Sequence, residues 1–193
     1  MTQNYRLKDI GRIDRNHKIS FIFNGKKYSG YKGDTLASAL LANGIHLIAR
    51  SFKYHRPRGI LAAGVDDPSA KVQLIKGSYS EPNINLTEFE LVEGLELKSQ
   101  NCWPSVSTDI GEINNLFNRF LPAGFYYKTF MWPKSFWYSV YEPFIRKAAG
   151  FGVASLDPDP DRYEHQYEHC DVLVVGSGPS GLSSALAAAK NGA

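Results

Sequence analysis

The sequence predicts an α+β domain followed by the beginning of an α/β domain. Two observations support this prediction. Near the N-terminus, two β-rich runs are joined by Asn24-Gly25 and followed by an apolar helical segment, which indicates a hairpin packed on a helix. At the other end, a valine-rich run precedes the glycine-rich segment 176–181 and an alanine-rich helix, which is the order that a dinucleotide-binding βα unit requires.

Composition narrows the class of protein. The chain has 193 residues, of which 43% are hydrophobic and 21% charged, as in ordinary globular proteins. No apolar stretch reaches the roughly 18 residues of a membrane span, and the N-terminus lacks the apolar core of a secretory signal. A cytoplasmic protein without a membrane partner is therefore expected. Two cysteines, Cys102 and Cys170, indicate no disulfide framework.

The N-terminal third is basic. Residues 1–60 contain 12 Lys/Arg against 3 Asp/Glu. Such a block could contact nucleic acid, an acidic partner or cofactor phosphates, but a solvated face or a subunit contact is the favoured interpretation. No nucleic-acid partner is expected.

The first domain is predicted over residues 18–100, after an irregular polar arm at 1–17. Residues 18–23 and 26–31 form the hairpin. The following helix, 35–43, begins after Asp34 as its N-cap and ends at Gly44. Its inward face consists of Leu36, Ala39, Leu40 and Asn43.

Later strands complete this domain. Residues 71–75 form one strand, and the alternating acidic and apolar residues 83–98 indicate one or two half-exposed strands around Gly94. A hairpin on one helix with additional strands predicts a ferredoxin-like β-grasp fold.

The loop over residues 50–70 is basic first and glycine-bearing afterwards. Contact with phosphate or an acidic surface is one interpretation of its cations, but for any single member a solvated loop is favoured. His55 has no partner that the sequence can name, which argues against a catalytic base. The basic residues are Arg50, Lys53, His55, Arg56 and Arg58.

Plant-type ferredoxins carry C-x4-C-x2-C in the loop after the first helix. That spacing falls here on Ala62, Asp67 and Ala70. None is cysteine, and two cysteines cannot supply four thiolates. The domain is therefore expected to lack its cluster cysteines and to bind no [2Fe-2S] cluster.

Residues 101–169 are predicted to be an aromatic docking segment and a linker. Residues 120–144 hold 11 of the 25 aromatic residues, interrupted by prolines and lysines that argue against a membrane span. Packing against other domains or subunits is favoured over stacking on nucleic acid. His165 and His169 of the linker and Cys170 directly after it lack the further ligands of a tetrahedral site, so no metal site is expected.

The segment 170–193 begins a Rossmann-type domain, with Val172–Val175 as its buried strand. The glycines permit a sharp turn, close approach of a pyrophosphate, and tight packing of helix on strand, while the helix N-terminus faces the anion. The predicted cofactor-binding residues are Gly176, Ser177, Gly178, Pro179, Ser180 and Gly181.

The motif alone does not separate NAD, NADP and FAD. The second strand and the acidic residue for the ribose would follow about 20 residues later. The chain is thus expected to be the truncated front of a longer protein.

Several stretches resemble the alpha subunit of heterotetrameric sarcosine oxidases. These stretches are residues 51–59 (SFKYHRPRG), 99–104 (SQNCWP), 119–137 (RFLPAGFYYKTFMWPKSFW) and 141–146 (YEPFIR). The resemblance covers nearly the whole chain, and Ser180 stands where the family usually has alanine.

The resemblance implies an enzyme that oxidises sarcosine to glycine, with oxygen as the final acceptor. The methyl carbon goes to tetrahydrofolate or is released as formaldehyde. It further implies NAD at residues 176–181, with FAD as the remaining possibility there, and FAD and FMN elsewhere in the holoenzyme. Beta, gamma and delta subunits are the implied partners, and no catalytic residue is expected within these 193 residues.

Two alternatives stay open. Related amine or opine dehydrogenase subunits share the layout, and some retain an iron–sulfur cluster; the absence of thiolates at the three loop positions favours the sarcosine oxidase branch. The other alternative is a non-catalytic docking module. The isolated chain is expected to be inactive.

Overall fold

The computed structural model describes residues 3–124, 130–152 and 154–193. The chain divides into two compact units, Met1–Pro160 and Asp161–Ala193. In the described residues, no helix is both long enough and apolar enough to span a membrane.

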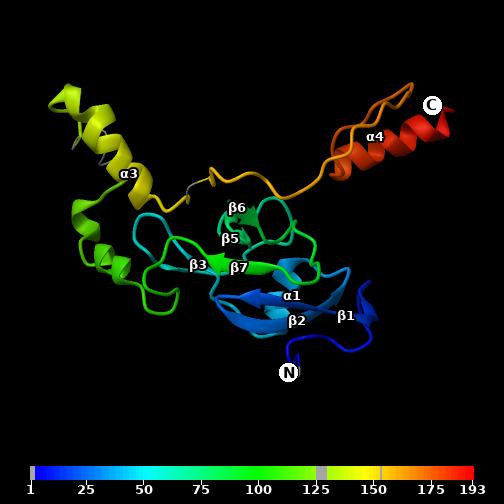
Figure 1. Cartoon of the computed structure of the whole chain (residues 1–193), viewed down its shortest axis with the longest axis horizontal. Coiled ribbons are helices and arrows are strands. Elements are labelled where there is room, and N and C mark those ends of the chain that lie inside the picture. Colours follow the sequence, from blue (N-terminus) through cyan, green and yellow to red (C-terminus); the bar gives the residue numbers. More distant parts are fainter. Residues whose placement is uncertain (1–2, 125–129, 153) are drawn as a thin grey trace. The chain divides into compact units, whose positions relative to one another are not determined.

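The first unit is built on a mixed, five-stranded sheet of order β2-β1-β7-β5-β6. Strands β1 and β7 are parallel, with Ile22 opposite Glu96, whereas the other neighbours are antiparallel. Figure 1 shows β7 between the blue β1–β2 hairpin and the green β5–β6 hairpin. The strands are β1 (Asp14–Phe23), β2 (Lys26–Lys32), β5 (Lys71–Lys76), β6 (Tyr79–Asn85) and β7 (Glu96–Ser99).

The predicted hairpin is confirmed. Phe23 pairs with Lys26, so Asn24 and Gly25 form a two-residue turn, and both have positive φ as the tight turn requires. Helix α1 (Leu36–Ala42) follows. A mixed sheet with one packed helix confirms the α+β class of this unit.

The N-cap prediction was wrong by one residue. Thr35 caps α1, because its hydroxyl accepts a hydrogen bond from the backbone N–H of Ser38 at 3.2 Å. Asp34 instead turns its carboxylate into the domain, where the residue is 1% exposed. Gly44 has φ +77° and ends the helix as predicted.

The carboxylate of Asp34 fastens the N-terminal arm to the domain. Arg6 donates from both terminal nitrogens to its two oxygens, at 3.0 and 2.7 Å. The backbone N–H of Tyr31 and the hydroxyl of Ser38 donate to the same group. The predicted irregular arm is thus held by a bidentate ion pair, and β1 begins at Asp14, inside the segment assigned to the arm.

The hydrophobic core lies between α1, the sheet strands and the loop before β7. The prediction of one or two strands over residues 83–98 is confirmed only at its two ends, which belong to β6 and β7, because residues 86–95 are a loop between them. Leu86, Leu91 and Leu95 of this loop are buried without belonging to a strand, which explains why the alternation of residue types resembled a strand. The largest core residues are Phe21, Phe23, Leu36, Leu40, Ile48, Val72, Leu74, Leu86, Leu91 and Leu97.

Gly30 on β2 allows this close packing. A β-carbon there would lie 3.1 Å from the β-carbon of Ala39 and would overlap the side chain of Leu91. We expect Gly30→Ala to lower the free energy of unfolding by about 1–3 kcal/mol through overpacking, as measured by urea denaturation. Gly64→Ala is the control, since a β-carbon there meets nothing within 4 Å and should leave stability unchanged. Equal stability of the two variants would contradict the packing argument.

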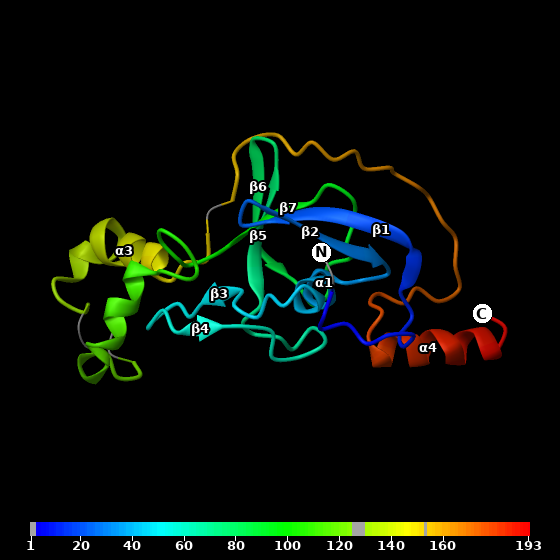
Figure 2. The same cartoon turned by 90° about the horizontal axis from the view of Figure 1, so that it is seen from below.

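The remaining elements are short. Figure 2 shows β3 and β4 as a two-stranded ribbon beside the main sheet. The elements of this group in the first unit are β3 (Ala49–Arg50), β4 (Pro57–Arg58), η1 (Ile110–Asn115), η2 (Asn118–Phe120), η3 (Lys134–Phe136), η4 (Trp137–Tyr141) and α3 (Glu142–Ala148). The second unit contains helix α4 (Pro179–Lys190).

Candidate functional site

The glycine-rich segment forms a turn into helix α4. Gly178 is the N-cap and Pro179 occupies the first helical turn, where a missing N–H costs nothing. No side chain caps this end of the helix, so the first-turn N–H groups of Ser180 and Gly181 have no side-chain acceptor from the cap. Asn191 is the C-cap, and the helix and its predicted stop are therefore confirmed.

Two glycines of the motif are required by the backbone itself. Gly176 has φ +110°, a conformation that side chains rarely permit. A β-carbon on Gly181 would collide with the carbonyl of Gly176, so the helix approaches the preceding loop as the motif requires. Gly178 faces open space, with nothing within 4 Å of an added β-carbon. Packing within the described residues therefore does not require a glycine at position 178.

The strand predicted at Val172–Val175 does not form in the structure. These residues are extended without a ladder, and Leu173 and Val175 are 77% and 89% exposed. A strand exists only through hydrogen bonds to a neighbour, and no described residue pairs with this segment. The apolar segment 172–175 is thus largely exposed, because no sheet covers it among the described residues.

The basic loop of the first unit binds its own chain. Arg50 has a side chain 4% exposed and donates to the carbonyls of Val106 and Ser107, to the carbonyl of His55, and to Glu112. Arg50 therefore ties the loop to the segment before η1. The prediction of a solvated loop was wrong for this residue.

The other cations of the loop have varied surroundings. Arg56 donates to Asn115 at 3.0 Å and stacks on the ring of Tyr54. Lys53 donates to the carbonyl of Pro122 at 3.0 Å. Arg58 is exposed on β4. Most of the predicted cationic patch thus holds residues 103–122 in place.

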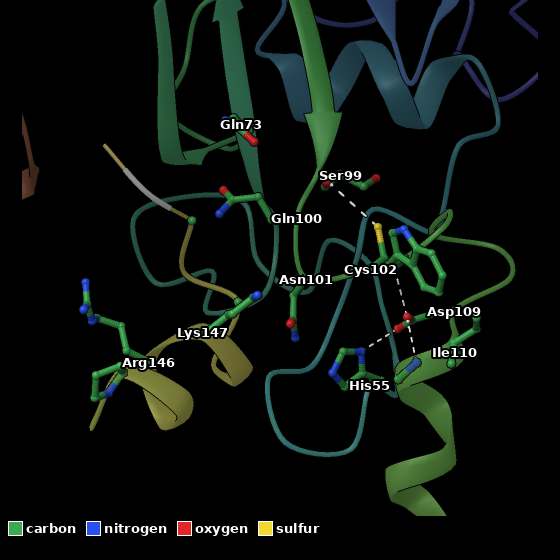
Figure 3. Close-up of a pocket in the computed structure, with 15 residues that line it drawn as sticks. His55, Gln73, Ser99, Gln100, Asn101, Cys102, Asp109, Ile110, Arg146 and Lys147 are labelled. Carbon is green, nitrogen blue, oxygen red and sulfur yellow. Dashed lines mark hydrogen bonds and ion pairs between the residues drawn. The ribbon is translucent and has the colours of Figure 1, made fainter. Parts of the chain in front are cut away.

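His55 has the partner that the sequence could not name. Its Nδ1 lies 2.6 Å from Oδ2 of Asp109, whose side chain is 1% exposed. The other oxygen of Asp109 accepts from the backbone N–H groups of Trp103 and Gly111. Figure 3 shows this pair on one side of a pocket, with Arg146 and Lys147 of α3 on another.

The pocket is open, with a volume of about 730 Å³. Cys102 lines it, but its thiol points toward the carbonyl of Ser99 (Figure 3). Burial raises the pKa of Cys102, and the charge of Asp109 raises it further. Cys102 is accordingly a poor nucleophile, and the pocket presents no activated thiol.

The residues considered as metal ligands lie apart from any cluster. His165, His169 and Cys170 are exposed in the second unit. Within residues 3–124, 130–152 and 154–193, no group of three His, Cys, Asp or Glu side chains is placed to hold a metal ion.

The chain is similar to known proteins over both of its units. The chain is 58% identical over 189 residues to a protein named sarcosine oxidase subunit alpha from Rhizobium meliloti (strain 1021), covering 98% of this chain and 19% of that protein. This chain is similar to sarcosine oxidase alpha subunits. The resemblance proposed from sequence motifs is confirmed.

Two further alpha subunits bear the same name. The one from Corynebacterium sp. (strain U-96) is 30% identical over 94% of this chain and 14% of its own length. The one from Corynebacterium sp. (strain P-1) is 32% identical over 100% of this chain and 16% of its own length. The chain therefore spans less than a fifth of each of these alpha subunits.

The family described as "2Fe-2S iron-sulfur cluster binding domain" matches residues 16–102. Among solved structures, the L-proline dehydrogenase from P. horikoshii matches with a TM-score of 0.36 and 25% identity, covering 45% of this chain and 16% of that chain.

The residues of the matched domain do not fit an iron–sulfur cluster. Ferredoxin clusters are held by four cysteine thiolates. The loop positions with the ferredoxin spacing are Ala62, Asp67 and Ala70, and the first two carry a methyl group and a carboxylate. Cys170 lies in the other unit, so Cys102 is the one thiol of the first unit.

Proposed function

We propose that this chain is part of the alpha subunit of a multisubunit flavoprotein oxidase. In this proposal the whole enzyme oxidises sarcosine to glycine, and the methyl carbon goes to tetrahydrofolate or formaldehyde. The identity of 58% along nearly the entire chain supports the assignment. In this proposal, the rest of the enzyme carries the catalytic residues and binds FAD and FMN. It also includes the beta, gamma and delta subunits.

The proposed role of residues 176–181 is to bind the pyrophosphate of a dinucleotide, NAD or FAD. The N–H groups of Ser180 and Gly181 at the uncapped end of α4 would face the anion, aided by the helix dipole. Gly178 would leave room for the phosphates, which gives a reason for a glycine that the fold itself does not need. The bound dinucleotide would supply redox chemistry, and the loop would supply binding and orientation.

The open space at Gly178 provides a clean test. Gly178→Val should fold normally, because no protein atom lies within 4 Å of an added β-carbon, but should block the pyrophosphate. We expect at least about a tenfold loss of bound nucleotide, since one lost contact of 1.4 kcal/mol already gives that factor. The measurement is mass spectrometry of nucleotides released by denaturing the full-length complex.

The matched control is Ser184→Ala, an exposed position on the same helix. It should retain stoichiometric nucleotide. Full retention by Gly178→Val would remove residues 176–181 from the proposed site.

A docking role is proposed for the aromatic segment 120–144. Of this segment, residues 125–129 lie outside the described residues. The described aromatics leave large apolar faces uncovered, which monomeric proteins rarely do. The most exposed are Trp132 (83%), Tyr138 (85%), Phe120 (76%) and Phe144 (65%). Other domains of the longer polypeptide or another subunit would cover them.

A further inference from the structure

The loop between β4 and β5 encloses a carboxylate. Asp67 is 2% exposed, although it lies in a loop. Its Oδ2 accepts from the backbone N–H groups of Leu61 and Ala62, at 2.7 and 2.9 Å. Its Oδ1 accepts from those of Ser69 and Ala70, both at 2.8 Å. Each oxygen therefore receives two backbone donors, Oδ2 from residues before Asp67 and Oδ1 from residues after it.

The rest of the loop closes around this group. The backbone N–H of Asp67 donates to the carbonyl of Gly64 at 3.2 Å, and the hydroxyl of Thr87 donates to the same carbonyl at 2.7 Å. The N–H of Leu86 donates to the carbonyl of Ala70 at 3.0 Å. Leu86 and Thr87, directly after β6, thus hold the loop at Ala70 and Gly64, on either side of Asp67 in the sequence.

The negative charge is balanced by peptide dipoles. Burial by itself raises the pKa of Asp67, but hydrogen bonds from Ala62, Ser69, Ala70 and Leu61 outweigh it, so the pKa lies below its ordinary value. Across the ranges that the structure describes, no Lys or Arg forms an ion pair with this carboxylate. The loop is therefore a concavity of N–H groups that favours an anion.

Concavities of backbone N–H groups also hold iron–sulfur clusters, whose sulfurs accept such hydrogen bonds. The family match places residues 16–102 with 2Fe-2S domains. Asp67 stands at the middle position of the ferredoxin spacing in this chain, between Ala62 and Ala70, and all three residues take part in the hydrogen-bonded ring. In this chain the backbone N–H groups at these positions therefore surround a carboxylate and not a cluster.

We propose that the Asp67 carboxylate takes the place of a [2Fe-2S] cluster as the anion that organises this loop. The domain keeps its loop conformation by an internal charge and needs no iron to do so. Asp67 then has a structural role, because its carboxylate fixes the loop that leads into β5. This inference does not depend on the proposed dinucleotide site.

Hydrogen exchange of the full-length protein, with its partner subunits, tests the proposal locally. In the wild type, the amides of Leu61, Ala62, Ser69 and Ala70 should exchange slowly. Asp67→Ala should speed their exchange at least about tenfold, because each loses a charged acceptor. Added formate should restore protection in this variant, while sodium chloride at equal ionic strength should not.

Asp66→Ala is the matched control, since Asp66 is the exposed neighbour in the same loop. It should keep wild-type exchange. Iron and acid-labile sulfide in the wild-type complex should be well below one [2Fe-2S] cluster per alpha subunit.

Three results would overturn the proposal. The first is a wild-type complex with stoichiometric iron and sulfide, both of which are lost in Asp67→Ala. The second is wild-type exchange of the four amides at the rate of an unstructured peptide, a measurement that stands even where the variant does not fold. The third is identical protection in Asp67→Ala and Asp66→Ala. Nucleotide content is a separate readout, so failure here is distinguishable from failure of the dinucleotide site.

Discussion

Arg6→Ala is expected to lower the free energy of unfolding by about 3–5 kcal/mol, the usual cost of leaving a buried charge without its partner. Asp34 has a side chain with no exposed surface, and Arg6 is its one cationic partner among the described residues. Without the guanidinium, the Asp34 carboxylate keeps only the neutral donors of Tyr31 and Ser38. Urea denaturation, with hydrogen exchange to locate the change at β2 and α1, measures the effect.

Arg12→Ala is the control, because it also removes one positive charge from the N-terminal arm. Arg12 is exposed in the same arm, so its removal should change stability by no more than about 0.5 kcal/mol. The double variant Arg6→Ala/Asp34→Ala should recover part of the loss, because no isolated charge is then buried. Simple additivity of the two single effects would show that the pair is not coupled.

Arg50→Ala is expected to release residues 103–112 from the domain and to cost about 2–4 kcal/mol. The guanidinium serves three backbone carbonyls and Glu112, and its removal leaves those carbonyls without their donor in a partly buried place. His55 and Asp109 should then lose their fixed separation, since both are in segments that Arg50 joins. Limited proteolysis within 103–112 and urea denaturation measure the two consequences.

Arg58→Ala is the matched control on the same loop. Arg58 is an exposed cation, and its loss should leave both proteolysis and stability unchanged. Arg50→Lys should be intermediate, because an ammonium keeps the charge but lacks the planar fork that reaches several acceptors. If Arg50→Ala behaved like Arg58→Ala, the loop would be held by other contacts.

Local chemistry made much of the fold predictable. The Asn24-Gly25 turn, the end of α1 at Gly44, and helix α4 with its glycine-rich start depend on residues close together in sequence. Similarity to sarcosine oxidase alpha subunits was also predictable, from stretches of sequence that need no coordinates. The dinucleotide assignment of residues 176–181 stays a prediction.

Other features depended on contacts between distant segments. The acidic and apolar alternation over 83–98 indicated a strand, because a buried loop and a half-buried strand leave the same pattern when burial is not known. Asp34 looked like a cap from its position, yet Arg6, 28 residues away, decides its orientation. The strand at Val172–Val175 failed to form because strands require neighbours.

The sequence alone determined the α+β start, the glycine-rich turn into α4 and the absence of a four-thiolate set, since these follow from residue type and short spacing. Only the tertiary structure decided the roles of the charged side chains. Arg6 with Asp34, Arg50 with residues 106 and 107, and His55 with Asp109 are pairs separated by 28 to 57 residues. The acceptor of a buried charge is set by how the chain folds back, and residue type does not encode that.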